Sequence, residues 1–259
     1  MYKGYNLKIE SYEVDILKRD LISEQDGDFN LEKSREKVHN TLNEQVQSFS
    51  FKESIDATEL MGDWFPQQKF DVFISHSHND LERAEVLANW LHVTFGLTSF
   101  IDSFVWKYAP DLLREIDNRY CLNLDGNSYD YYKRNFTTNQ VYIMLANSLT
   151  SMIDRTECLI FLNTPNSVNI EDTVKNQSKS PWIFHELNTS QIIQRRLPDR
   201  KVTHDSMVFT NESRDLPDFL YKLQMEHLES INFSSLIAWK NKYLANENFM
   251  DSLDILYNS

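Results

Sequence analysis

The feature that most constrains the fold is a pair of short, almost continuous apolar runs, FDVFI at residues 70–74 and CLIFL at residues 158–162. Such runs are typical of strands that are buried on both faces of a parallel sheet. Apolar residues at helical spacing follow the first run over about residues 81–92, and Gly96 is well placed to end that helix. This order predicts an α/β fold with a flavodoxin-like parallel sheet flanked by helices.

Other segments extend the same alternation. Ser180 and Pro181 predict a helix start, because serine caps helices and proline suits the first helical position. Residues 121–139 are polar and rich in tyrosine, which favours an inserted loop. The remaining expected elements are a strand at 97–101, a helix from Pro110, a helix at 140–153, the helix from Ser180 to about 196, a weaker strand at 202–209 and a helix at 236–244.

The first 66 residues differ in pattern from the rest. Alternating apolar residues over 5–16 predict a kinked strand or a hairpin arm, and residues 30–47 predict a polar helix with a narrow apolar stripe. That stripe would dock on its own domain or on a second protomer. We therefore expect an N-terminal α+β extension at 1–66, a main domain at 67–259, and an insertion in it near 121–153. The stripe comprises Val38, Leu42 and Val46, and the linker lies between Gly62 and Pro66.

Composition excludes several classes of protein. The formal net charge of −13 disfavours a nucleic-acid partner. The two cysteines form no C-x-x-C pair, the N-terminus lacks a signal peptide's apolar core, and no apolar stretch approaches the ~20 residues that span a bilayer. These features predict a cytoplasmic protein without membrane contact. The glycines are too far apart for a Rossmann or P-loop phosphate motif; they are Gly4, Gly27, Gly62, Gly96 and Gly126.

Three polar loops follow the predicted strands: SHSHND at 75–80, DSFVWKYAP at 102–110 and NTPNSV at 163–168. Ligands of open parallel sheets bind at the carboxyl ends of the strands, so these loops are expected to converge on one crevice. In SPWIFHEL, Trp182 and Glu186 stand four residues apart and share one helix face.

The ordered set of motifs resembles a Toll/interleukin-1 receptor (TIR) domain. DVFIS at 71–75 resembles the opening strand of that family, G-L-x-x-F-x-D recurs at 96–102, and S-x-W-x-x-x-E-L recurs at 180–187. The stretch before the third strand is longer than usual. The loop after Asp102 also lacks the glycine and proline arrangement of receptor-type members, which argues against receptor-adaptor signalling.

The resemblance implies an enzyme that cleaves the nicotinamide–ribose bond of NAD⁺, with Glu186 as the catalytic carboxylate. It further implies bacterial antiphage defence, a product that is ADP-ribose or its cyclic or conjugated form, homo-oligomers through TIR–TIR contacts, and a separate effector protein that senses the product. No cofactor or metal is expected beyond NAD⁺ as substrate. The expected substrate-binding residues are Ser75, His76, Ser77, Asp102, Trp106 and Trp182.

Each of these residues also has a structural interpretation. Glu186 could be a solvated helix residue, Trp182 could pack its helix on the sheet, and Asp102 could form a turn. A rival chemistry is a metal-dependent hydrolase, because His76-x-His78-x-Asp80 resembles a zinc-binding motif, although Asp80 also suits a helix cap. A further alternative is a non-catalytic TIR interaction module.

Overall fold

The computed structural model groups the chain into two compact units. The sheet unit comprises residues 1–29, 69–101 and 152–259, and the hairpin unit comprises 30–68 and 102–151. The structure describes residues 1–24, 61, 69–103, 109–168, 177–178, 180–193, 195, 221–246 and 251–258. The helix expected at 30–47, the linker near 62–66, the strand expected at 202–209, and Trp106 lie outside the described residues.

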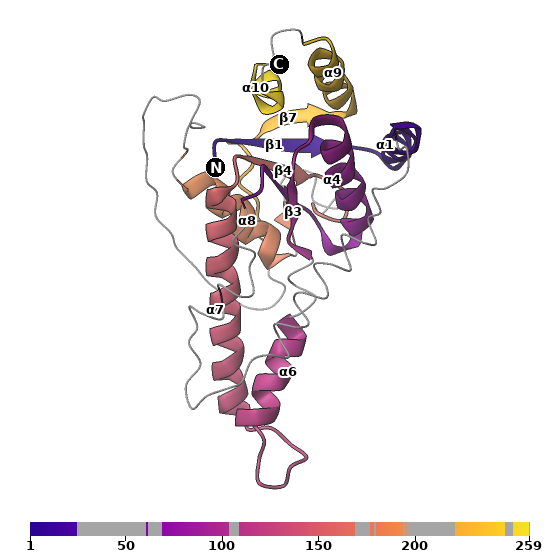
Figure 1. Ribbon diagram of the computed structural model, residues 1–259. Helices are drawn as coiled ribbons and strands as arrows, with labels where there is room; N and C mark the ends of the chain where they lie inside the picture. Colours follow the sequence, from indigo (N-terminus) through magenta and orange to yellow (C-terminus); the bar gives the residue numbers. More distant parts are fainter. Residues whose placement is uncertain are drawn as a thin grey trace. The chain divides into compact units, whose positions relative to one another are not determined.

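A five-stranded, all-parallel sheet forms the centre of the sheet unit, in the order β3-β2-β4-β1-β7 (Figure 1). Both apolar runs are strands in it, and every residue of β2 and β4 is buried, so these predictions are confirmed. The strands are β1 (Lys3–Lys8), β2 (Val72–Ser75), β3 (Ser99–Ile101), β4 (Cys158–Leu162) and β7 (Glu229–Asn232).

The strand order creates a topological switch point. From β2 the chain goes to β3 on one side and later to β4 on the other, which is the 2-1-3 order of flavodoxin-like sheets. The connections diverge there, and folds of this kind bind ligands beside the carboxyl ends of the strands at such a point, which here are those of β2 and β4. The expected α/β sheet is therefore observed, with a switch point at β2 and β4.

The N-terminal segment differs from its prediction. Strand β1 pairs with both β4 and β7, so it is an interior strand of the main sheet, not part of a separate extension. The expected continuation as a strand is wrong, because helix α1 (Ser11–Glu24) follows. Val14 and Leu17 are buried at helical spacing, whereas Tyr12 and Ile16, which an alternating pattern groups with Val14, are exposed.

Helices α1, α4 (Leu81–Phe95) and α9 (Phe233–Leu244) pack together through aromatic and ionic contacts. The rings of Phe95 and Trp239 stack at 4.0 Å, and Trp90 meets Trp239 edge-on. Asp20 of α1 accepts hydrogen bonds from Trp90 and from Lys240. As predicted, Gly96 ends α4 in the left-handed conformation, with φ of 72°. Helix α10 (Ser252–Tyr257) follows α9, and its residue 252 carbonyl accepts the Trp239 indole N–H.

Two further elements complete the sheet unit near the predicted helix start. A short 3₁₀ turn, η1 (His78–Asp80), leads from β2 into α4. Helix α8 (Pro181–Ile192) begins where the Ser180-Pro181 pair predicts, since the Ser180 hydroxyl accepts from the Ile183 N–H at 3.3 Å. A two-stranded antiparallel pair is formed by β5 (Gln177–Ser178) and β6 (Tyr221–Lys222).

The hairpin unit contains α6 (Ala109–Tyr120) and the first 21 residues of α7 (Tyr131–Arg155), which run antiparallel (Figure 1). The expected loop at 121–139 is therefore too long, because α7 begins at residue 131. The Asp130 carboxylate accepts from the Lys133 N–H at 2.9 Å and so caps this start. None of the helices in the described ranges is long and apolar enough to cross a bilayer.

Candidate functional site

Glu186 is a buried carboxylate on helix α8. Its relative exposure is 0%. A glutamate is almost never fully buried unless it has a partner. Leu187 and Ile183 are buried on the same helix, so their packing holds α8 in place. The interpretation of Glu186 as a solvated surface residue is therefore wrong. Burying a carboxylate is costly, and such groups concentrate at functional sites.

Ser75, the last residue of β2, is a hydrogen-bond partner of Glu186. Its hydroxyl donates to Glu186 Oε2 at 2.5 Å, and Ser75 is also 0% exposed. The bond joins the end of a sheet strand to a helix 111 residues further along the chain. Hydrogen bonds to ionised groups are roughly twice as strong as neutral ones. Two residues that the sequence places in one site are thus in direct contact, and the Ser75 hydroxyl hydrogen is already used.

The other expected binding residues occupy varied environments. His76 is buried, and its Nδ1 lies 3.3 Å from the Ile74 carbonyl, while Ser77 is half-buried at the start of η1. Trp182 is half-buried on α8 and meets the His185 ring edge-on at 6.3 Å. Asp102 directly follows β3 and is buried, but it falls within the hairpin unit.

Asp80 has a role that the sequence did not predict. It stands at the N-cap position of α4, yet its side chain makes no capping hydrogen bond, so the capping interpretation is wrong. Its carboxylate instead accepts hydrogen bonds from Thr164 at 2.5 Å and from Asn166 at 2.9 Å, and it forms an ion pair with Arg83 at 3.4 Å. These contacts therefore join two of the three loops that were expected to converge, those that follow β2 and β4.

The same contacts weaken the metal-hydrolase alternative. Of its three proposed ligands, His76 is buried, His78 is exposed, and the Asp80 carboxylate is already bonded to three other side chains. Within the described ranges, no group of three or more His, Cys, Asp or Glu side chains is arranged to hold a metal ion. The H-x-H-x-D spacing in the sequence is therefore not matched by a converging set of donors.

A second connection fixes the far half of α8. The Ser190 hydroxyl donates to the Leu187 carbonyl at 2.8 Å and lies 2.8 Å from His227 Nε2. Burial lowers the pKa of His227 to about 4, and the nearby Arg195 guanidinium acts in the same direction. This imidazole is therefore neutral near pH 7. Sequence reasoning missed the pair because Ser190 and His227 share no local motif.

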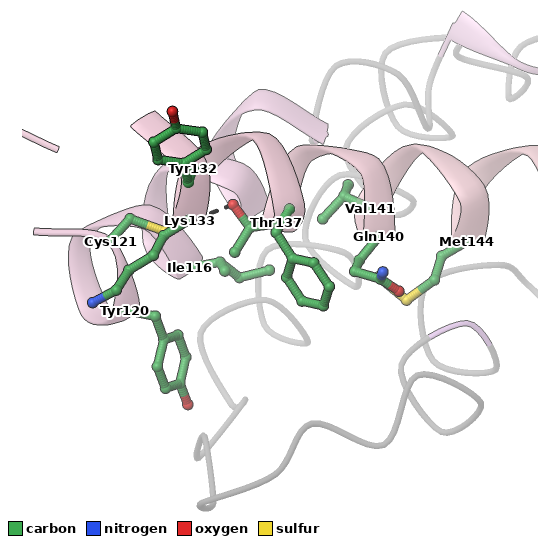
Figure 2. A pocket seen from close by; sticks show the side chains of 10 residues that line it. Ile116, Tyr120, Cys121, Tyr132, Lys133, Thr137, Gln140, Val141 and Met144 are labelled. Atoms are coloured by element: carbon green, nitrogen blue, oxygen red, sulfur yellow. Dashed lines mark hydrogen bonds between the residues drawn. The ribbon is translucent and has the colours of Figure 1, made fainter. Parts of the chain in front are cut away.

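The hairpin unit has its own cavity, of ≈ 680 Å³, between α6 and α7 (Figure 2). In the same unit the Asp117 carboxylate accepts hydrogen bonds from Arg134 and Thr137, both at 2.8 Å, and burial raises the pKa of the Cys121 thiol. None of the expected site residues that the structure describes lines it. The lining residues are Ile116, Tyr120, Cys121, Tyr132, Lys133, Phe136, Thr137, Gln140, Val141 and Met144.

Among the described residues of the sheet unit, the Ser75–Glu186 pair is an arrangement suited to chemistry. A carboxylate held at a strand end, away from water, can stabilise a positive charge that develops on a bound molecule. Its position beside the switch point of the sheet agrees with where such folds bind ligands. No protein-family model, no curated protein and no solved structure matches this chain.

Proposed function

We propose that the protein cleaves the nicotinamide–ribose bond of NAD⁺, with Glu186 as the catalytic carboxylate. The observation that carries the proposal is the fully buried Glu186 side chain, hydrogen-bonded to Ser75 at the carboxyl end of β2. The resemblance of DVFIS, G-L-x-x-F-x-D and S-x-W-x-x-x-E-L to TIR enzymes supports it independently.

The proposed reaction needs few groups. The bond between ribose C1′ and nicotinamide N1 breaks, and its electron pair leaves with nicotinamide, which becomes neutral. Positive charge then develops on the ribose, and the Glu186 carboxylate stabilises it, as carboxylates do at other sugar centres. Attack of water on C1′ forms ADP-ribose and releases one proton. Attack by a nucleophile of the same or another nucleotide forms the cyclic or conjugated product.

The burial of Glu186 has two consequences for this proposal. A site without water has a low effective dielectric, so the attraction between carboxylate and developing cation is stronger than in solution. Because no part of Glu186 is exposed, the side chains that cover it must move before a ribose can reach the carboxylate. We therefore expect a resting form with low activity.

The decisive experiment is incubation of the purified protein with NAD⁺, with products resolved by chromatography and mass spectrometry. The proposal expects release of nicotinamide together with ADP-ribose or a cyclic or conjugated form. In the proposed defence role, a separate effector protein binds that product. Absence of nicotinamide release at every protein concentration tested would count against the proposal.

A non-catalytic interaction module is the second candidate, and exposed aromatic side chains on α7 favour it. Tyr132 is 82% exposed, and Tyr131 and Phe136 lie beside it with most of their surface in water. Large exposed apolar groups in a cluster are typical of protein contact surfaces. Under this alternative the protein binds a partner through the hairpin unit, and NAD⁺ stays intact in the same assay.

Metal removal separates the proposal from the hydrolase alternative. We expect NAD⁺ cleavage to continue in the presence of a chelator, because the Asp80 carboxylate is engaged by Thr164, Asn166 and Arg83. Elemental analysis of the purified protein is the matching measurement. Stoichiometric zinc that disappears in His76→Ala, together with chelator-sensitive activity, would favour the metalloenzyme instead.

Self-association is expected to control the activity. TIR enzymes complete their active site across two subunits, so we expect specific activity to rise with protein concentration, measured alongside light scattering. Truncation cannot test the N-terminal contribution, because it would remove interior strand β1. Serine substitutions at Val38, Leu42 and Val46 are better suited, and the same substitutions at Lys37, Thr41 and Gln45 are the control. An unchanged concentration profile in the stripe variant would exclude residues 30–47 from assembly.

A further inference from the structure

The carboxyl ends of three adjacent strands meet around one pair of charged side chains. In the order β2-β4-β1, each strand is hydrogen-bonded to the next, and all three run in the same direction. The segments that leave them carry Asp80 after β2, Thr164 after β4, and Ser11 after β1. These segments border the switch point at which a ligand is expected to bind.

Asp80 connects the first of these segments to the second. It is 1% exposed, and its carboxylate accepts from the Thr164 hydroxyl at 2.5 Å and from Asn166 Nδ2 at 2.9 Å. A buried carboxylate with hydrogen-bond donors on both oxygens is held in one orientation. The loop after β4 is thereby fixed relative to the turn after β2.

Arg83 extends the connection to the third segment. Its Nε lies 3.4 Å from Asp80 Oδ1, while its Nη2 donates to the Ser11 hydroxyl at 2.8 Å and its Nη1 to the Ile9 carbonyl at 3.5 Å. The planar guanidinium therefore spans from α4 to the start of α1. One ion pair joins the segments that follow all three strands.

The loop after β4 is also braced from inside. The Thr164 hydroxyl accepts from the N–H groups of Asn166 and Ser167, at 3.2 and 3.3 Å, and the Ser167 hydroxyl donates to the Leu162 carbonyl at 2.8 Å. The Val168 N–H bonds to the Thr164 carbonyl. Because these amides are used within the loop, it does not offer the row of free N–H groups that cradles a phosphate. The loop would therefore contribute a fixed shape to a site, and not a row of amide hydrogen bonds.

We propose that Asp80 is a positioning residue for the NAD⁺ site, which holds the loop at residues 163–168 as one wall of the substrate crevice. This inference rests on the proposed function, and it adds to the site a residue that acts by fixing the loop at residues 163–168. The buried Asp80 carboxylate makes no helix-capping hydrogen bond, and among the residues that the structure describes it belongs to no converging set of metal ligands.

Asp80→Asn is the variant that tests this role. It keeps the size of the side chain and removes the charge, so the bond from Asn166 and the ion pair with Arg83 are weakened. We expect KM for NAD⁺ to rise about tenfold, as for loss of a bond to a charged group, with a smaller change in kcat. Hydrogen exchange of a peptide over residues 163–168 should become faster, and NAD⁺ should no longer protect it.

Should this variant not fold, Asn166→Ala removes one hydrogen bond to Asp80 at an exposed residue. It is expected to change the same measurements to a smaller extent.

Asp71→Asn is the matched control at the opposite end of β2. Asp71 Oδ2 accepts from the N–H and the hydroxyl of Thr98, at 2.8 and 2.7 Å, so it forms an equivalent Asp–Thr contact at the amino end of the strand. This variant should lose thermal stability with KM unchanged. An equal rise of KM in both variants would mean that Asp80 contributes only to the stability of the fold.

Other outcomes also overturn the inference. An unchanged KM in Asp80→Asn, or a wild-type loop at 163–168 that NAD⁺ does not protect while α8 is protected, excludes that loop from the site. Failure of the proposed function looks different, because it appears as full turnover by Glu186→Gln. Wild-type protein that neither binds nor cleaves NAD⁺ overturns both proposals together.

Discussion

Glu186→Gln is expected to lower kcat for NAD⁺ cleavage by about 100- to 1,000-fold, the usual cost of removing one group that stabilises transition-state charge. The amide keeps the shape of the side chain and can still accept a hydrogen bond from Ser75. The fold and the affinity for NAD⁺ should therefore change little. Steady-state kinetics give kcat, and titration of the inactive variant with NAD⁺ gives the affinity.

Glu85→Gln is the control for that result, since Glu85 is a second buried glutamate in the same unit, on α4. It should keep turnover close to wild type, which would show that loss of a buried carboxylate alone does not abolish activity. Turnover by Glu186→Gln equal to wild type, under conditions where wild type is active, would remove Glu186 from the mechanism.

The sheet could be predicted because short apolar runs in the sequence indicate its strands. Five consecutive apolar residues at 158–162 indicate a buried strand, and the predicted range is the observed one. Strand β1 gave a weaker signal, because Gly4 and Asn6 interrupt its apolar residues. Its interior position depends on pairing with β4, about 150 residues away, and no local pattern reports such a partner.

Helix boundaries were predicted less well, for two different physical reasons. In α1, Tyr12, Val14 and Ile16 alternate by chance, while burial selects Val14 and Leu17 at helical spacing. In α7, residues 131–136 are all exposed, so no buried apolar stripe marks the start of the helix. The cap at Asp130 was the available signal for that start.

The candidate site was predictable in part. Motif resemblance pointed to Ser75 and Glu186, and the structure places them in contact. The role of Asp80 was not predictable, because two of its partners, Thr164 and Asn166, are more than 80 residues away. A short polar motif such as H-x-H-x-D matches several chemistries, and only the contacts made by each side chain separate them.

Ser75→Ala is expected to lower kcat by about 10- to 100-fold, the equivalent of losing a hydrogen bond to a charged group, with a smaller change in KM. The reason is that the Ser75 hydroxyl orients the Glu186 carboxylate, and its single hydrogen is not available to the substrate. Ser99→Ala is the control, because Ser99 is a half-buried serine at the amino end of the neighbouring strand β3, and this variant should stay near wild-type activity.

Combining the two substitutions distinguishes orientation of Glu186 from direct contact with NAD⁺. If Ser75 acts only through Glu186, adding Ser75→Ala to Glu186→Gln should not change NAD⁺ affinity further, because residues that act as one unit give non-additive effects. If Ser75 instead binds the ribose, as the sequence resemblance implies, affinity should fall again in the double variant. Titration with NAD⁺ of the single variant Glu186→Gln and of the double variant measures this difference in affinity. The titration does not require turnover. A clear loss of affinity in the double variant would assign Ser75 to the substrate and leave the orientation of Glu186 to its other neighbours.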